Sequence, residues 1–284
     1  MKKDKTHIHW YPGHIAKAER KLEEQLSLVD AVIEVLDARI PLSSRYDNIT
    51  GLLNQKPRFL LVNKCDLVDK IELDKFIEFL KQETQTSVIT TTSKNSKDLN
   101  IIVKEAVKLS EPKIQAIMAK GLLRRPARIM VVGLPNVGKS SIINKLTRSS
   151  KTKTGAKAGV TRQQQWVRIN PQLELLDTPG IIPMKQEDQQ RATKLAFVNS
   201  VGDNAYSNDF VAKELLNILN EKQTKIFKNY YEIDENTELN LENIALKRKW
   251  LIKNQEPDIE RTAGYLLKDF REGKIGKFIL DELP

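Results

Sequence analysis

The sequence has 284 residues, 40% of them hydrophobic, which is enough for one large globular domain and a smaller one. Its formal charge is +10, from 47 Lys and Arg against 37 Asp and Glu, and this favours a polyanionic partner. Cys65 is the only cysteine, so the sequence excludes an intrachain disulfide and a multi-cysteine metal site. No apolar run reaches the roughly 18 residues of a membrane span and the N-terminus lacks a signal-peptide pattern, so we expect a cytoplasmic protein without a membrane partner.

Short β-branched apolar runs alternate with helical patterns through the first two thirds of the chain. In chain order we expect a helix, two strands, a helix, two strands, a helix and two strands, at 14–29, 31–36, 58–62, 71–82, 87–91, 128–132, 141–146, 164–169 and 173–176. This alternation predicts an α/β fold with a mostly parallel sheet and helices on both faces, in which 164–169 is an antiparallel edge strand.

Strand signals stop after about residue 183. The remaining helical patterns cover 209–219, 241–252 and 258–270, and they predict a small all-helical domain. We therefore expect a first domain at 1–185 and a helical C-terminal domain at 186–284, joined by a linker near 181–190.

A phosphate-binding loop is predicted at residues 133–140, which match G-x-x-x-x-G-K-[ST] between a strand and a helix. Lys139 is expected to neutralise the β- and γ-phosphates, and the Ser140 hydroxyl to bind Mg²⁺. The start of the following helix adds the positive end of its dipole. The amides expected to surround the phosphates belong to Asn136, Val137, Gly138, Lys139, Ser140 and Ser141.

Asp177 and Gly180 follow the predicted strand 173–176 in the pattern D-x-x-G. A carboxylate at this strand end can hold Mg²⁺, and the Gly180 amide can contact the γ-phosphate. Thr161, in the polar loop 155–161, is the candidate switch residue that would fold onto Mg²⁺ when the γ-phosphate is present. An ordinary loop threonine is the alternative.

Asn63, Lys64 and Asp66 follow the strand 58–62 in the pattern N-K-x-D and predict a guanine site. A carboxylate at Asp66 accepts from the N1–H and N2 amino groups of guanine, an edge that adenine lacks, so GTP and GDP are favoured over ATP. Ser93 and Lys94 follow the next strand, where a backbone amide can contact the guanine carbonyl.

The order of these motifs is inverted, because 63–66 and 93–94 precede 133–140, 161 and 177–180, whereas Ras-like GTPases have the phosphate loop first. Together with Trp-Tyr-Pro-Gly-His at 10–14 and Asp-Ala-Arg-Ile-Pro at 37–41, this order resembles the circularly permuted GTPases of the RbgA/YlqF ribosome-assembly family, over nearly the whole chain. The resemblance implies a Ras-like, circularly permuted P-loop GTPase fold.

The resemblance also implies a function. Members of this family assist late maturation of the large (50S) ribosomal subunit, bind rRNA through the helical domain and hydrolyse GTP faster on the ribosomal particle. Ile181 stands where Ras-type enzymes carry a glutamine, and the resemblance implies His14 as the catalytic substitute, although a histidine at a helix start is more often a capping or surface residue. It further implies K⁺ binding at Asn136.

The basic segment between Glu111 and Glu174 contains no acidic residue, which favours contact with RNA over a merely solvated cationic face. We expect a monomer that binds a precursor of the large subunit. The alternative is a GTP-gated switch that recruits a protein partner through the helical domain, with hydrolysis as a slow timer.

Overall fold

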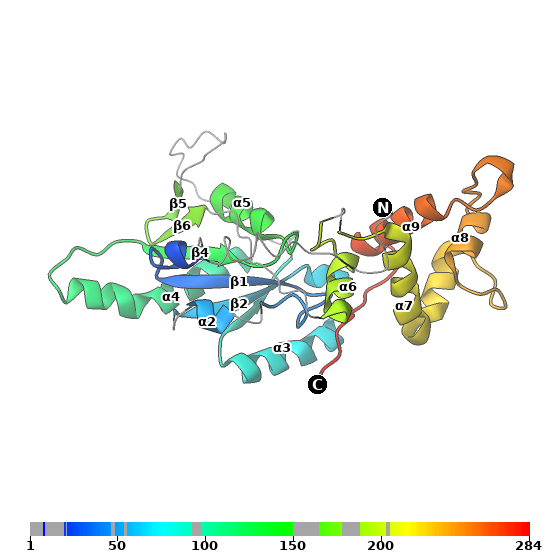
Figure 1. Ribbon diagram of the computed structural model, residues 1–284. Coiled ribbons are helices and arrows are strands. Elements are labelled where there is room, and N and C mark those ends of the chain that lie inside the picture. Colours follow the sequence, from blue (N-terminus) through cyan, green and yellow to red (C-terminus); the bar gives the residue numbers. More distant parts are fainter. Residues whose placement is uncertain are drawn as a thin grey trace.

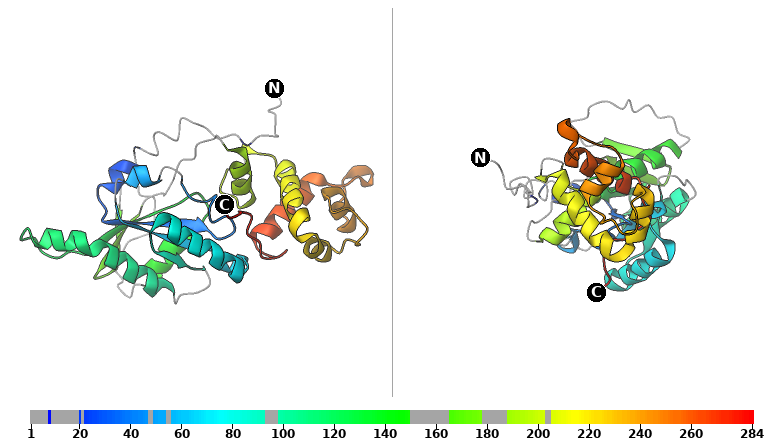
Figure 2. Two further views of the ribbon diagram at one scale, coloured as in Figure 1. Left: turned by 90° about the horizontal axis from the view of Figure 1, so that it is seen from below. Right: turned by 90° about the vertical axis from the view of Figure 1, so that its right-hand side faces the viewer.

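The computed structural model describes residues 8, 20, 22–46, 49–53, 56–92, 98–149, 165–177, 188–202 and 205–284 (Figure 1). An α/β part and a helical C-terminal part lie end to end, so the molecule is elongated in Figure 1 and in the left view of Figure 2. In these described ranges, no helix has the length and apolarity that a membrane crossing needs.

A six-stranded sheet forms the centre of the α/β part, in the order β3-β2-β1-β4-β6-β5. All neighbouring pairs are parallel except β5 and β6, so the predicted parallel sheet and its antiparallel edge strand are confirmed. The parallel strands end at one edge of the sheet, which faces the helical part (Figure 1). The strands are β1 (Ala31–Asp37), β2 (Arg58–Asn63), β3 (Val88–Thr90), β4 (Ala127–Val132), β5 (Gln165–Asn170) and β6 (Leu173–Asp177).

Helices cover both faces of the sheet. Helix α3 (Lys70–Thr84) buries Leu73, Phe76, Ile77 and Leu80 against one face, formed by Leu36, Leu60 and Val62. Helix α4 (Asp98–Met118), which the patterns did not predict, buries its apolar side in the main core with Val35, Phe59 and Leu61 of the other face. Shorter helical elements are α2 (Ile49–Leu53), η1 (Cys65–Leu67) and α5 (Lys139–Ser149).

The C-terminal part contains α6 (Gln189–Phe197), α7 (Asn208–Tyr231), α8 (Leu241–Lys247), η3 (Lys253–Gln255) and α9 (Ile259–Arg271). The predicted helix 241–252 is wrong beyond Lys247, because Lys249 takes a left-handed backbone (φ 54°) and Leu251 forms a β-bridge with Pro257. The predicted helix 209–219 extends to Tyr231. The predicted helix 14–29 is wrong at its C-terminal end, because the helical structure ends at Leu26. The predicted domain boundary at 185 lies outside the described residues.

The C-terminal tail returns to the α/β part. The Leu280 amide donates to the Arg39 carbonyl, and the Asp281 carboxylate accepts from the amides of Leu42 and Ser43, both at 2.8 Å. Asp281 is only 4% exposed and also lies 3.2 Å from the Lys194 ammonium on α6. The C-terminal tail therefore holds the loop after β1, and Asp281 links that loop to α6.

Candidate nucleotide site

The phosphate loop and the guanine loop lie in contact, although the residues that touch are 72 and 74 positions apart in the sequence. The Asn63 side-chain amide, at the end of β2, donates to the Val137 carbonyl at 2.9 Å. The Lys64 ammonium donates to the Asn136 carbonyl at 2.6 Å. A Cβ atom on Gly138 would lie 2.1 Å from the Asn63 amide nitrogen, so glycine is required for this approach. The two loops are therefore close enough to contact the phosphates and the base of one nucleotide.

The backbone of the phosphate loop needs glycine at a second position. Gly133 has φ 151°, and a Cβ there would lie 2.5 Å from the Val35 carbonyl oxygen on the neighbouring strand. Gly138 has φ 104°. These two residues let the loop turn tightly between β4 and α5, so that its amides converge at the start of α5 as a phosphate site requires.

Lys139, the first residue of α5, donates from its ammonium to the Leu134 carbonyl at 2.6 Å, across the phosphate loop. Burial lowers the pKa of Lys139 to about 8, because desolvation disfavours the charged form. A bound phosphate could take the place of this carbonyl and would favour the charged form of Lys139, which raises its pKa again. Ser140 and Ser141 follow in the first turn of α5 and are exposed.

The guanine loop is braced by the loop after β3 and by α5. The Thr92 hydroxyl donates to the Asp66 carboxylate at 2.7 Å, and the Lys145 ammonium on α5 donates to the Thr92 carbonyl at 3.3 Å. Lys64 has a left-handed backbone (φ 65°) at the start of η1. Ser93 and Lys94 directly follow Thr92 but lie outside the described residues.

Asp37 binds the Lys64 side chain, a role that the sequence did not suggest. Its carboxylate is fully buried and accepts from the Lys64 ammonium at 2.7 Å and from the Arg39 guanidinium at 2.7 and 2.9 Å. Burial alone would raise the pKa of Asp37, but the Arg39 and Lys64 cations hold it well below its usual range. The signals in the sequence were the Asp-Ala-Arg-Ile-Pro motif at 37–41 and, within it, a charged pair two residues apart at the end of a buried strand.

Asp177, a predicted ligand of Mg²⁺, is the last residue of β6. Strand β6 pairs with β4, the strand that leads into the phosphate loop. A hydroxyl at Ser140 and a carboxylate at Asp177 are hard oxygen donors, which fit Mg²⁺ once phosphate oxygens are present. Among the described residues no group of three or more His, Cys, Asp or Glu can hold a metal ion. His14, Thr161 and Gly180 lie outside the described residues.

Asn136, at the tip of the phosphate loop, contacts the C-terminal part. Its side-chain amide donates to the Asn199 carbonyl at 2.6 Å, and the neighbouring Ser200 hydroxyl donates to the Pro135 carbonyl at 2.8 Å. Asn199 and Ser200 belong to the turn that follows α6. No pattern in the sequence indicated that a segment of the C-terminal part would lie on the phosphate loop.

A phosphate loop that meets an N-K-x-D loop at the carboxyl edge of a mostly parallel sheet defines a P-loop GTPase, here with its motifs in permuted order. A family model described as "50S ribosome-binding GTPase" matches residues 128–249. The chain is 35% identical to "Ribosome biogenesis GTPase A" of Bacillus cereus, over 96% of this chain and 93% of that protein. It is 33% identical to "Mitochondrial ribosome-associated GTPase 1" of Mus musculus, over 96% of this chain and 89% of that protein.

A crystal structure of GNP-bound YlqF from T. maritima has a TM-score of 0.63 and 28% identity, covering 94% of this chain and 100% of that chain. A GDP-bound structure of the same protein has a TM-score of 0.64. The chain belongs to the ribosome biogenesis GTPase A (RbgA/YlqF) family. GTP hydrolysis is therefore its activity, and the fold resemblance drawn from the motif order is confirmed.

Proposed function

We propose that this GTPase acts in the cytoplasm as a monomeric assembly factor for the large ribosomal subunit, whose RNA-containing precursor particle binds it and stimulates hydrolysis. The supporting names are those of its relatives, a ribosome biogenesis GTPase and a ribosome-associated GTPase. The observation that carries the proposal is the pair of contacts between Asn63 and Val137 and between Asn136 and Asn199. They join the guanine loop, the phosphate loop and the C-terminal part.

Within the site we assign the guanine edge to Asp66, the packing of the base to Lys64, and the β/γ-phosphate charge to Lys139. Asn63 fixes the guanine loop against the phosphate loop. Bound Mg²⁺ would offset the charge on the phosphates, and its protein ligands would be Ser140, Asp177 and Thr161. Ser93, Lys94, Val137, Gly138, Ser141 and Gly180 complete the nucleotide contacts.

His14 is proposed to orient the attacking water, because Ile181 has no group that can do so. Asn136 is the proposed K⁺ ligand. Its amide group has an oxygen as well as the nitrogen that donates to Asn199, so one side chain can serve both contacts.

The basic segment 113–168 supports RNA contact less than its composition suggests. Lys113 and Arg125 both pair with buried Asp30, at 3.0 and 2.7 Å. Arg124 pairs with Glu111 at 2.7 Å, and the Arg128 guanidinium lies over the Trp166 ring. These four cations are paired within the protein, which makes them less available to RNA.

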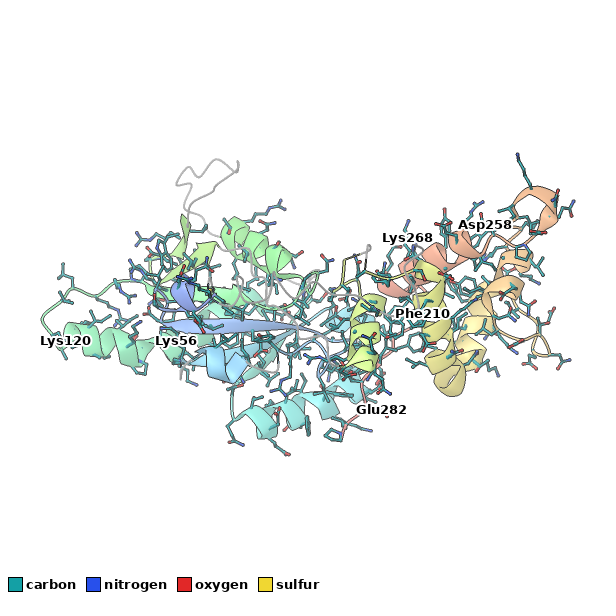
Figure 3. The ribbon with its side chains drawn as sticks, viewed as in Figure 1. Lys56, Lys120, Phe210, Asp258, Lys268 and Glu282 are labelled. Carbon is teal, nitrogen blue, oxygen red and sulfur yellow. The ribbon has the colours of Figure 1, made fainter. Side chains whose placement is uncertain are left out.

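The end of the C-terminal part farthest from α4 offers a better surface (Figures 1 and 3). Trp250 and Tyr265 stack with ring centroids 4.7 Å apart, and Tyr265 is 42% exposed. The Arg261 guanidinium lies over both rings, at 5.5 and 5.8 Å. Exposed aromatic and guanidinium planes bind unpaired RNA bases, and nearby lysines bind phosphates. We define this basic aromatic tip by Lys247, Lys249, Trp250, Lys253, Arg261 and Tyr265.

Co-sedimentation with ribosomal subunits in GDP, GTP and a non-hydrolysable GTP analogue tests the proposal. We expect nucleotide-dependent pelleting with the large subunit, and GTP turnover that rises when the particle is added. In the His14→Ala variant this rise should be lost while nucleotide affinity is kept. Pelleting with the small subunit only, or with neither subunit, would contradict the proposal.

A protein-recruiting switch is the second candidate, favoured by Leu246, Leu251 and Ile252, which are 52%, 37% and 52% exposed near the same tip. Salt dependence separates the two functions. RNA contact releases counterions, so particle binding should weaken steeply as salt rises. Binding that is insensitive to salt and persists after the RNA is digested would favour the protein partner.

A further inference from the structure

Arg271, the last residue of α9, is connected to both loops of the nucleotide site through residues that lie between them. Its guanidinium donates to the carbonyls of Phe197 and Ala196 at 2.9 and 2.8 Å, and to the Tyr206 hydroxyl at 3.1 Å. Both carbonyls lie in the last turn of α6, where the helix dipole is negative, and the Ala196 carbonyl also accepts from the Asn199 amide at 3.1 Å. Arg271 therefore caps α6 from a different helix.

The capped end of α6 leads directly to the phosphate loop. Two residues after Phe197 the Asn199 carbonyl accepts from the Asn136 amide, and next to it the Ser200 hydroxyl donates to the Pro135 carbonyl. Ser200 is fully buried, and Asn199 has a left-handed backbone (φ 63°), so the turn has little freedom once α6 is capped. The position of residues 135 and 136 thus depends on the end of α6.

A second path joins Arg271 to the guanine loop. The Arg271 carbonyl accepts from the Arg39 guanidinium at 3.3 Å, and Arg39 pairs with Asp37, which holds Lys64. Lys64 in turn donates to the Asn136 carbonyl. The two paths meet there and close a ring of contacts that runs through the phosphate loop, the guanine loop and the C-terminal part.

We propose that Arg271 is a positioning residue for the GTPase reaction, which holds the phosphate loop in its nucleotide-binding shape through the end of α6 and Ser200. Arg271 is not a catalytic residue, since all its contacts are to other parts of the chain. A partner that shifts α9 when it binds therefore changes the nucleotide affinity. Because coupling between two binding sites is reciprocal, bound nucleotide then changes the affinity for that partner by the same factor.

The test measures the dissociation constants of fluorescent GDP and GTP analogues, together with kcat, KM and the thermal midpoint. For Arg271→Ala we expect about a tenfold rise in both dissociation constants and in KM, with kcat changed less than about threefold, because a charge-assisted contact that shapes the ground-state site is lost. Arg271→Lys, which keeps the charge but not the two-pronged geometry, should recover part of the affinity.

Arg248→Ala is the matched control. The Arg248 guanidinium donates to the Tyr230 carbonyl near the end of α7 at 2.8 Å, so it makes the same kind of contact in the same part of the chain, outside the ring. We expect its thermal midpoint to fall while nucleotide affinity stays within about twofold. If Arg271→Ala behaves in the same way, Arg271 is only structural and the proposal is wrong.

A double-mutant cycle of Arg271→Ala with Ser200→Ala tests the path itself. Residues on one path give losses in nucleotide affinity that are less than additive, whereas full additivity overturns the proposal. If Arg271→Ala does not fold, Arg271→Lys and Ser200→Ala decide the matter: raised dissociation constants support the proposal, and values within twofold of the unchanged protein overturn it. Loss of ribosomal pelleting alone, with normal nucleotide affinity, would contradict this inference without touching the proposed function.

Discussion

Removing the carboxylate of Asp37 should destabilise the α/β part strongly and weaken guanine binding. The Asp37→Ala variant leaves the Arg39 guanidinium, whose side chain is only 3% exposed, without its counter-ion. It also removes the group that holds the Lys64 ammonium, which is 21% exposed. A buried charge that loses its partner is costly because neither water nor protein then neutralises it.

Breaking a buried ion pair from one side costs about 3–5 kcal/mol. Asp37 accepts two hydrogen bonds from the Arg39 guanidinium, one from the Arg39 amide and one from Lys64. At about 1.5–3 kcal/mol for each charged hydrogen bond, their sum would exceed this range, but bonds to one carboxylate are not independent, so we use the lower figure. A loss of this size corresponds to roughly 6 °C or more in the thermal midpoint.

Urea unfolding measures this loss without adding salt that would screen the ion pair. The double variant Asp37→Ala with Arg39→Met, which removes both charges, should recover part of the stability. The depressed pKa of Asp37 adds a pH signature. Its stabilisation is present above the ordinary carboxyl value of 3.8 and is lost as the pH falls towards the folded pKa, so the difference from Asp37→Asn should shrink in acid. A loss below about 1 kcal/mol for Asp37→Ala at neutral pH would refute the reasoning.

Three further outcomes are expected. Gly138→Ala should reduce nucleotide affinity at least about tenfold, because the added Cβ atom would clash with Asn63. The control is Gly264→Ala on α9, which should be tolerated because no atom lies within 4 Å of the added Cβ. Equal losses of affinity for the two variants in a binding titration would contradict this expectation. Burial holds the pKa of Lys139 at about 8 in the free protein, whereas a bound phosphate favours the charged form. GTP affinity should therefore fall as the pH rises above 8, and a flat profile to pH 9.5 would oppose the assignment. Burial raises the pKa of the Cys65 thiol to about 12, so alkylation near pH 8 should be slow until urea unfolds the chain, and rapid native labelling would count against it.

The central strands β1, β2 and β4 were predictable because their apolar runs are buried along nearly their whole length, as in β1, where every residue is buried. Helix α4 was not predictable by the same rule. Its buried face includes the small residues Ala106 and Ser110, and Pro112 lies inside the helix, where a proline is usually read as a helix end. The end of α8 was missed because its reversal depends on Lys249, an amino acid that does not announce a left-handed turn.

The nucleotide loops could be found from the sequence because their chemistry needs particular residues at fixed spacing. The contacts that join these loops to the C-terminal part could not be found in this way. Arg271, Ser200 and Asp281 are polar residues in ordinary surroundings along the chain, and their importance arises from partners 65 to 239 residues away. Such contacts depend on the tertiary fold, and local patterns carry no information about them.

The central claim is that Asp66 recognises guanine at the same site where Lys139 binds phosphate. Asp66→Asn replaces one carboxylate oxygen by an amide donor, which suits the 2-carbonyl of xanthine and leaves the guanine 2-amino group without an acceptor. The most direct measurement is therefore the affinity of this variant for xanthosine and guanosine diphosphates. We expect GDP to bind at least about 100-fold more weakly and xanthosine diphosphate to bind more tightly than it does to the unchanged protein. GDP affinity within about threefold of the original, with no gain for xanthosine diphosphate, would contradict the account.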